Sequence, residues 1–191
     1  MTSKSTIVAP LPQHIEKYLG TIEFGWSLKN TSHDLQVVRI SNSPITGAAT
    51  YCTLGLSFLV MAMPDGRTVR QELVFSAYPR FTPEVLPSLL LSLGEHIIAL
   101  RKPLLRGQVI SPTTSLSLLG EGSALYCSIP VCFDPSFATF NGSVPPTVLV
   151  WLVPISKSEV LFIKTNGCSK FEDHLEIKSP DLWDLQRDSV V

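Results

Sequence analysis

Hydrophobic and polar positions follow three different patterns along this chain, and each pattern predicts a different kind of element. Over residues 68–78 the period is two, which predicts a strand with Val69, Gln71, Leu73 and Phe75 on one face and a second face at least partly wet. After residue 81 the period becomes about 3.6, which predicts a helix. Residues 147–155, TVLVWLVPI, are almost continuously apolar and predict a central strand buried on both faces.

Shorter segments complete the pattern. Residues 12–20 predict a short helix that stops at Gly20, and residues 25–33 read as a loop. Further strands are expected over residues 35–41, 50–63 and 124–133. The second of these ends in PDGR, a turn signal that predicts a hairpin with the strand over residues 68–78.

The long helix carries its own start signals. Thr82 is the expected N-cap and Pro83 the first helical residue, while Pro87 lies in the first turn or the helix begins one turn later. Arg101 and Lys102 suit the negative end of the helix. The apolar stripe consists of Leu86, Leu89, Leu90, Leu93, Ile97 and Leu100.

Two helix starts appear close together near the end of the chain. Ser156 with Glu159 fits a capping box, and Ser169 with Glu172 fits a second one. Between them, Asn166-Gly167 suits the end of the first helix. The sequence therefore predicts two short helices joined by a tight corner.

Composition and charge narrow the class of protein. With 191 residues, 45% of them hydrophobic, we expect one domain over residues 11–191 after a flexible segment at residues 1–10. The formal net charge of -1 gives no general attraction to nucleic acid or to an anionic membrane. Because no signal peptide or membrane-length apolar run is present, and no cysteine pair has C-x-x-C spacing, we expect a cytoplasmic protein with reduced thiols.

Candidate chemistry is sparse. Ser57 lies in LGLSFL, but Leu59 stands where a hydrolase nucleophile elbow needs glycine. The four histidines are isolated from one another, so no catalytic, cofactor-binding or metal site is predicted. One alternative stays open, an enzyme or small-molecule site assembled from Cys127, His96 and Asp134.

Trp183 is the informative residue of the C-terminal segment SPDLWDLQR. A tryptophan beside three acidic residues is either a lid packed on the core or an anchor for a partner.

The order of these segments resembles the suppressor of fused domain family. The resemblance runs from about Leu11 to Val191 and is carried by YCTLGLS, QELVFSAYP, LLRGQVIS and the stretch VLVWLVPISKSEVLFIKTNGCSKFEDHLE, with DLQRDSVV closing the chain. It implies an α+β fold with a mixed, mainly antiparallel sheet, a long central helix and a C-terminal pair of short helices. It also implies a protein that binds another protein and is not an enzyme.

Two kinds of partner follow from this resemblance. Compact single-domain bacterial members look like immunity proteins of toxin systems, whereas the animal relative sequesters a transcription factor by holding an extended peptide. The aromatic residue of the family's peptide-facing strand corresponds to Tyr51, but the acidic residues that the animal protein carries after GLS are replaced here by Phe58, Leu59 and Val60. Tyr51 and Trp183 are therefore the predicted partner-binding residues.

Overall fold

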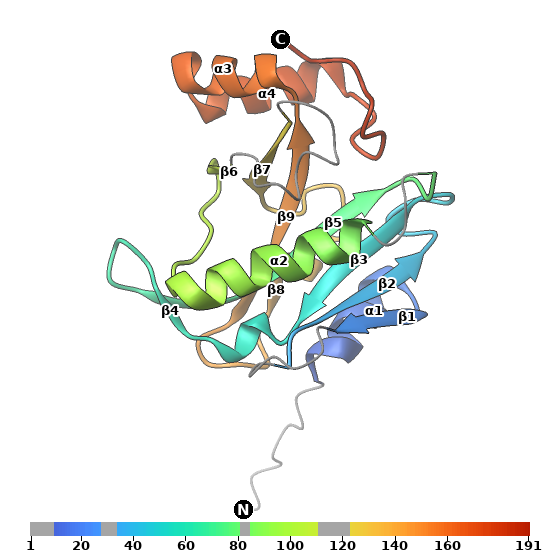
Figure 1. Cartoon of the computed structure of the whole chain (residues 1–191), viewed down its shortest axis with the longest axis vertical. Helices are drawn as coiled ribbons and strands as arrows, with labels where there is room; N and C mark the ends of the chain where they lie inside the picture. Colours follow the sequence, from blue (N-terminus) through green and yellow to red (C-terminus); the bar gives the residue numbers. More distant parts are fainter. Residues whose placement is uncertain (1–9, 28–33, 81–84, 111–122) are drawn as a thin grey trace, which may run out of the picture.

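The computed structural model describes residues 10–27, 34–80, 85–110 and 123–191, and a mixed sheet forms its centre (Figure 1). Strand order across the sheet is β1-β2-β3-β5-β9-β7-β6, with β4 paired to β5 and β8 paired to β9. The strands are β1 (Phe24–Ser27), β2 (Gln36–Ser41), β3 (Ala49–Leu54), β4 (Met61–Ala62), β5 (Thr68–Ala77), β6 (Val109–Ile110), β7 (Ala124–Ser128), β8 (Thr139–Phe140) and β9 (Thr147–Ile155). All pairs are antiparallel except β5 with β9, so the predicted α+β class with a mainly antiparallel sheet is confirmed.

Helices cover both faces of the sheet. Helix α2 (Val85–Leu100) packs on one face, where it crosses the front of the sheet in Figure 1. The other face is covered by α1 (Leu11–Leu19), the 3₁₀ turn η3 (Pro135–Ala138), and side chains from α3 (Lys157–Asn166), α4 (Cys168–Lys178) and the C-terminal segment. Among the described helices, none is both long and apolar enough to cross a bilayer.

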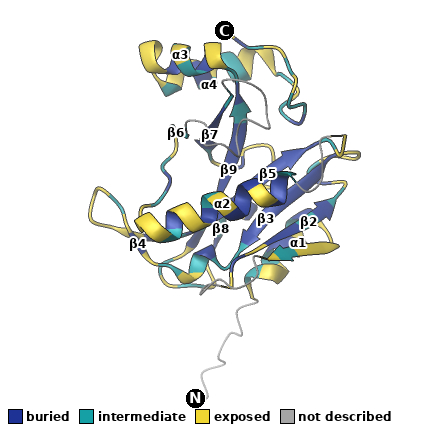
Figure 2. Cartoon of the chain, in the orientation of Figure 1, coloured by how far each residue is buried: buried dark blue, intermediate teal, exposed yellow. Residues whose placement is uncertain are grey.

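Strand β5 has a partly wet face only at its start, where Thr68 is exposed and Arg70 is half-buried, and the rest of the strand is buried on both faces. The strand lies between β3 and β9 under apolar residues from both helix layers, so even Gln71 and Glu72 are buried (Figure 2). Glu72 accepts hydrogen bonds from Thr53 Oγ1 at 2.6 Å and from the amides of Gly55 and Ser57, each at 2.9 Å. Its burial raises the pKa of the Glu72 carboxyl, while these hydrogen bonds act in the opposite direction.

The long strand expected over residues 50–63 is broken. Strand β3 ends at Leu54, and Gly55 adopts a φ of 114° that leads into the 3₁₀ turn η1 (Leu56–Phe58). A Cβ at residue 55 would lie 2.4 Å from the carbonyl oxygen of Asp34, so only glycine fits this break. Strand β4 then forms the predicted hairpin with β5 across the PDGR turn.

Two other boundaries differ from prediction. Residues 25–27 of the expected loop belong to strand β1, which pairs with β2, while residues 28–33 lie outside the described part. Strand β7 ends at Ser128 and does not reach residue 133. Cys132 therefore lies beyond the strand and is exposed, whereas Cys127 is buried within it.

The two N-terminal helices follow their patterns closely. Helix α1 ends before Gly20, whose amide donates to the carbonyl of Glu16. In α2, Pro87 is the third helical residue, where the missing N–H removes no helix hydrogen bond. The predicted cap at Thr82 and Pro83 lies outside the described residues.

The C-terminal helix pair forms as predicted, but only its first capping box does. Ser156 Oγ accepts from the Glu159 amide at 3.3 Å, and the Glu159 carboxylate accepts from the Ser156 amide at 2.8 Å. Helix α4 instead begins directly after Gly167 with no side-chain cap. Glu172, the expected partner of Ser169, accepts from Tyr126 and Arg106, because α4 packs that carboxylate against β7.

Candidate interaction surface

Trp183 packs on the core. This is the first of the two arrangements that its sequence allowed, a lid over the core. Its ring centroid lies 5.6 Å from that of Trp151 and 6.3 Å from that of Phe133, and the residue is 8% exposed. The amide of Trp183 donates to the Asp181 side chain, so the turn holds the indole in place. Contact between Trp183 and a partner stays a prediction.

Tyr51 lies in the other half of the core, on the sheet face that α2 covers. The residue is 2% exposed, and its ring centroid is 6.1 Å from that of Trp26, a half-buried residue on edge strand β1. Tyr51 and Trp183 therefore occupy opposite faces of the sheet and do not form one patch. Partner binding by Tyr51 also stays a prediction, and alanine at either position is expected to destabilise the fold.

The alternative site of Cys127, His96 and Asp134 is not assembled. Cys127 is buried among the apolar residues under α2, and burial raises the pKa of its thiol to about 12. His96 is exposed on α2, whereas Asp134 caps η3 on the opposite face by accepting from the Ser136 amide. Within the described residues, no group of three or more His, Cys, Asp or Glu side chains could hold a metal ion.

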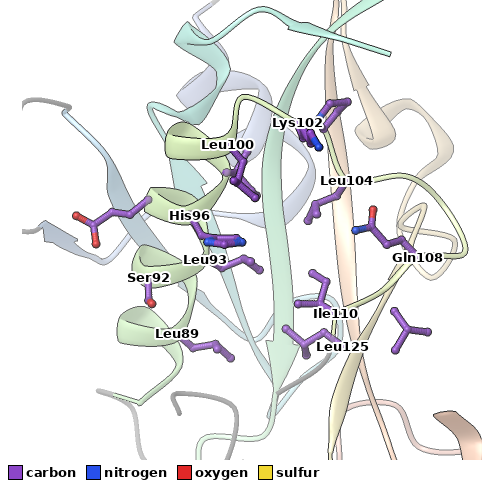
Figure 3. Close-up of a pocket in the computed structure, with 14 residues that line it drawn as sticks. Leu89, Ser92, Leu93, His96, Leu100, Lys102, Leu104, Gln108, Ile110 and Leu125 are labelled. Atoms are coloured by element: carbon purple, nitrogen blue, oxygen red, sulfur yellow. The ribbon is translucent and has the colours of Figure 1, made fainter. Parts of the chain in front are cut away.

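A groove lies between α2 and strand β6 (Figure 3). It has a volume of about 670 Å³, which lies in the range of pockets that bind ligands or partner side chains. Its apolar lining consists of Leu89, Leu93, Ile97, Leu100, Leu104, Val109, Ile110 and Leu125. We call this feature the α2–β6 groove.

The two walls of the α2–β6 groove are fixed in different ways. Helix α2 packs on the sheet through Leu86 and Leu90, which are buried. On the other wall, the buried Gln71 side chain donates to the Leu104 carbonyl at 2.8 Å and accepts from the Leu104 amide at 2.9 Å. This reciprocal pair holds the chain after α2 against β5, so the groove is formed before any partner arrives.

Polar side chains line the groove together with the apolar ones. Figure 3 shows His96 and Ser92 on the helix wall, Gln108 on the opposite wall and Lys102 at one end. Leu100, in the last turn of α2, is 52% exposed although it belongs to the apolar stripe. A mainly apolar lining with a few polar groups suits the burial of a partner's side chains.

Among the described strands, β6 (Val109–Ile110) lies at one edge of the sheet, beside the groove. In the described part of the chain, β6 pairs with β7 alone. An open edge offers backbone N–H and C=O groups to an incoming strand. The groove therefore combines apolar contacts with backbone hydrogen bonding.

Sequence reasoning missed this groove, although two signals were present. The apolar stripe of α2 continues to Leu100, one turn beyond the part that the sheet covers. Gln71 also interrupts an otherwise apolar strand face, and such a buried amide indicates a fixed backbone contact elsewhere in the chain.

Comparison with known families identifies this architecture. The family model described as suppressor of fused protein (SUFU) matches residues 31–188. The chain therefore belongs to the suppressor of fused family, as its segment order indicated. No curated protein matched the chain in a sequence comparison.

Solved structures share the fold at low sequence identity. A putative SUFU homologue from Neisseria gonorrhoeae is 18% identical with a TM-score of 0.72, over 94% of this chain and 93% of that chain. A chain of the Sufu–Fu complex is 15% identical with a TM-score of 0.68, over 93% of this chain and 89% of that one. Drosophila Suppressor of Fused is 17% identical with a TM-score of 0.59, over 83% of this chain and 43% of that protein.

Proposed function

We propose that this protein is a non-catalytic binding domain of the immunity type, which neutralises a cognate toxin by covering part of its surface. The observation that carries the proposal is the preformed α2–β6 groove, an apolar hollow beside the edge strand of the described sheet, on a member of a family that includes a structure solved as a protein complex. The compact chain matches nearly the whole length of the Neisseria homologue.

The chemistry of the described side chains supports binding over catalysis. Cys127 is buried away from His96, and Asp134 is engaged in a cap on the other face, so no nucleophile lies beside a base in this set. The near-neutral net charge favours a partner recognised by shape and apolar contact over a polyanion. We infer a cytoplasmic location because all four cysteines are free thiols, as is usual in a reducing compartment.

A regulatory role is the second candidate function. The Sufu–Fu complex shows that a chain of this fold forms a complex with Fu. On this reading, the groove holds a peptide segment of a transcription factor or another regulatory protein.

Two matched variants test the binding surface. Leu100→Asp places a charge in the groove, whereas Ile177→Asp makes the same change in the last turn of α4, where the side chain is 82% exposed. The wild-type protein is used to capture partners from its native cells, the captured protein is identified by mass spectrometry, and its affinity for each variant is measured. We expect Leu100→Asp to weaken binding by about tenfold or more and Ile177→Asp to leave it unchanged.

The function of the complex separates the two candidates. If the partner inhibits growth when expressed alone, co-expression with the wild-type protein should restore growth and co-expression with Leu100→Asp should not. A captured partner that is a regulator without toxicity would favour the second candidate. Capture that is equally strong with Leu100→Asp would contradict the groove as the binding surface.

A further inference from the structure

A second apolar surface lies on two loops that Arg70 connects. Phe58, in η1, is 82% exposed, and Val144, between β8 and β9, is 90% exposed. Val60 is also exposed, in the residues that lead to β4. We call Phe58, Val60, Val144 and Arg70 the Arg70 surface.

The backbone that carries Phe58 is held firmly. Leu56 is fully buried in the core on one side of Phe58, and Leu59 packs against the same core on the other. The amides of Gly55 and Ser57 donate to the buried Glu72 carboxylate. Phe58 is therefore turned outward by a fixed turn, and its exposure leaves a large aromatic side chain in water.

Arg70 ties the two loops together. Its Nη1 donates to the carbonyls of Ser57 at 2.7 Å and Phe58 at 3.1 Å, and its Nη2 reaches the carbonyl of Val144 at 3.5 Å. Both strongly exposed side chains therefore extend from residues whose carbonyls contact the same guanidinium. An interface residue held in this way loses little conformational entropy on binding.

The charge of Arg70 is left without a carboxylate partner. None of the carboxylates in the described residues lies within ion-pair distance of its guanidinium, and the nearby Glu72 is occupied by three donors. Nε of Arg70 is buried with no hydrogen-bond acceptor, and Nη2 has a second N–H beyond its long contact to Val144. The Arg70 guanidinium therefore has N–H groups that donate to no acceptor in the described residues.

A cavity beside Phe58 brings apolar and charged groups together. It measures about 510 Å³, and Arg70 and Phe58 both line it. Its apolar lining includes Leu11, Leu54 and Phe140, and its single acidic residue is Asp34, which is exposed. An arriving carboxylate would be attracted by Arg70 and repelled by Asp34.

We propose that the Arg70 surface binds a protein segment in which an apolar side chain stands next to an acidic one. The apolar side chain contacts Phe58 and Val144, and the carboxylate accepts from the guanidinium of Arg70. Hydrogen bonds between charged groups are stronger than neutral ones, so the acidic residue gives the segment its specificity. This surface is separate from the α2–β6 groove, so the two proposals stand or fail independently.

A membrane surface is the less favoured partner for these residues. Binding to anionic lipid depends on several basic residues acting together, and among the described residues that line this cavity Arg70 alone is basic. Arg67, on the same hairpin, is paired with Asp65 at 2.7 Å. The formal net charge of -1 adds no general attraction.

Selection from a random peptide library displayed on phage tests the proposal. The library is selected on the wild-type protein and counter-selected on Phe58→Ser, whose exposed position leaves the fold intact. We expect the enriched peptides to carry Asp or Glu next to an apolar residue. Enrichment of Lys or Arg instead, or no enrichment beyond the counter-selection, would overturn the proposal.

Variants then measure the contribution of each group to binding of an enriched peptide. Phe58→Ser and Val144→Ser should each weaken binding by about tenfold, Asp34→Asn should strengthen it, and Ile177→Ser on α4 should have no effect. Replacing the acidic residue of the peptide by Lys should abolish binding. Equal affinity for Lys and Glu peptides, or stronger binding of the protein to phosphatidylglycerol vesicles than to the peptide, would contradict the assignment.

Discussion

Gln71, Glu72 and Glu159 are buried, and each one fixes backbone that is distant in sequence. Gln71 pairs with Leu104, Glu72 holds the turn at Gly55 and Ser57, and Glu159 accepts from the Val190 amide at 3.1 Å. A buried polar group without partners is costly, so each of these side chains restricts the chain to one arrangement. At the residue scale, buried polar groups position the loops that form the proposed surfaces.

The four cysteines differ sharply in exposure, and this difference predicts their reactivity. Burial raises the pKa of the Cys52 and Cys127 thiols, which keeps them protonated and out of reach of reagents. Cys132 is exposed. With iodoacetamide at pH 8, we expect Cys132 to react before Cys52 and Cys127, which should be modified only after unfolding. Peptide mapping by mass spectrometry measures the order, and modification of Cys52 in the folded protein would contradict it.

Sequence patterns predicted these residues unevenly. The continuous apolar run of β9 predicted its burial, because every residue except Thr147 is apolar. Burial of Glu72 could not be predicted in this way, because its partners are backbone amides beyond a strand break at Gly55. A charged residue in a strand with period two ordinarily marks a wet face, and here tertiary contacts override that pattern.

At the scale of elements, helix starts are set by more than local sequence. Both serine–glutamate pairs have the spacing of a capping box, yet only Ser156 and Glu159 form one. Glu172 is taken by Arg106 and Tyr126, because α4 packs against β7. The local sequence predicts a capping box at the start of each helix. Tertiary packing decides that only the first one forms.

This distinction predicts unequal effects of two matched substitutions. Ser156→Ala removes an N-cap and should lower the free energy of unfolding by about 1 kcal/mol. Ser169→Ala changes an exposed residue of α4 with no capping role, so its effect should stay within about 0.5 kcal/mol. Urea unfolding followed by circular dichroism measures both. Equal losses would show that the second capping box forms in solution.

Elements also differ in how well the sequence predicted the proposed surfaces. The groove depends on α2, which was predicted, but its other wall depends on a contact between Gln71 and Leu104 that no local pattern encodes. The Arg70 surface depends on η1, which replaces part of an expected strand. Both surfaces therefore arise where the chain departs from regular periodicity.

At the scale of the whole molecule, the C-terminal segment completes one half of the core. Trp183 and Val190 are buried against the face opposite α2, and Arg187 donates to Glu159 at 2.8 Å. The Arg187 side chain is almost fully buried and Glu159 is fully buried, so this ion pair lies inside the fold. The segment therefore stabilises α3 and the sheet together.

Loss of this ion pair should be far more costly than loss of an exposed one. Arg187→Ala leaves Glu159 buried without its charged partner and should lower the free energy of unfolding by about 3 kcal/mol. Arg67→Ala breaks an exposed pair with Asp65, which water screens, so it should leave the free energy of unfolding almost unchanged. Thermal and urea unfolding of the two variants give the comparison. A loss for Arg187→Ala no larger than that for Arg67→Ala would show that the segment does not hold the fold together.

The parallel pairing of β5 with β9 has a consequence for how the molecule is made. Leu73 lies opposite Val150, so the middle of the sheet joins two parts of the chain that are synthesised far apart in time. Until the ribosome has passed β9, the inner edge of β5 has no neighbour and its apolar side chains stay open to other nascent chains. Such long-range pairing slows folding, and production of this protein is therefore most vulnerable to aggregation during translation of residues 78–155.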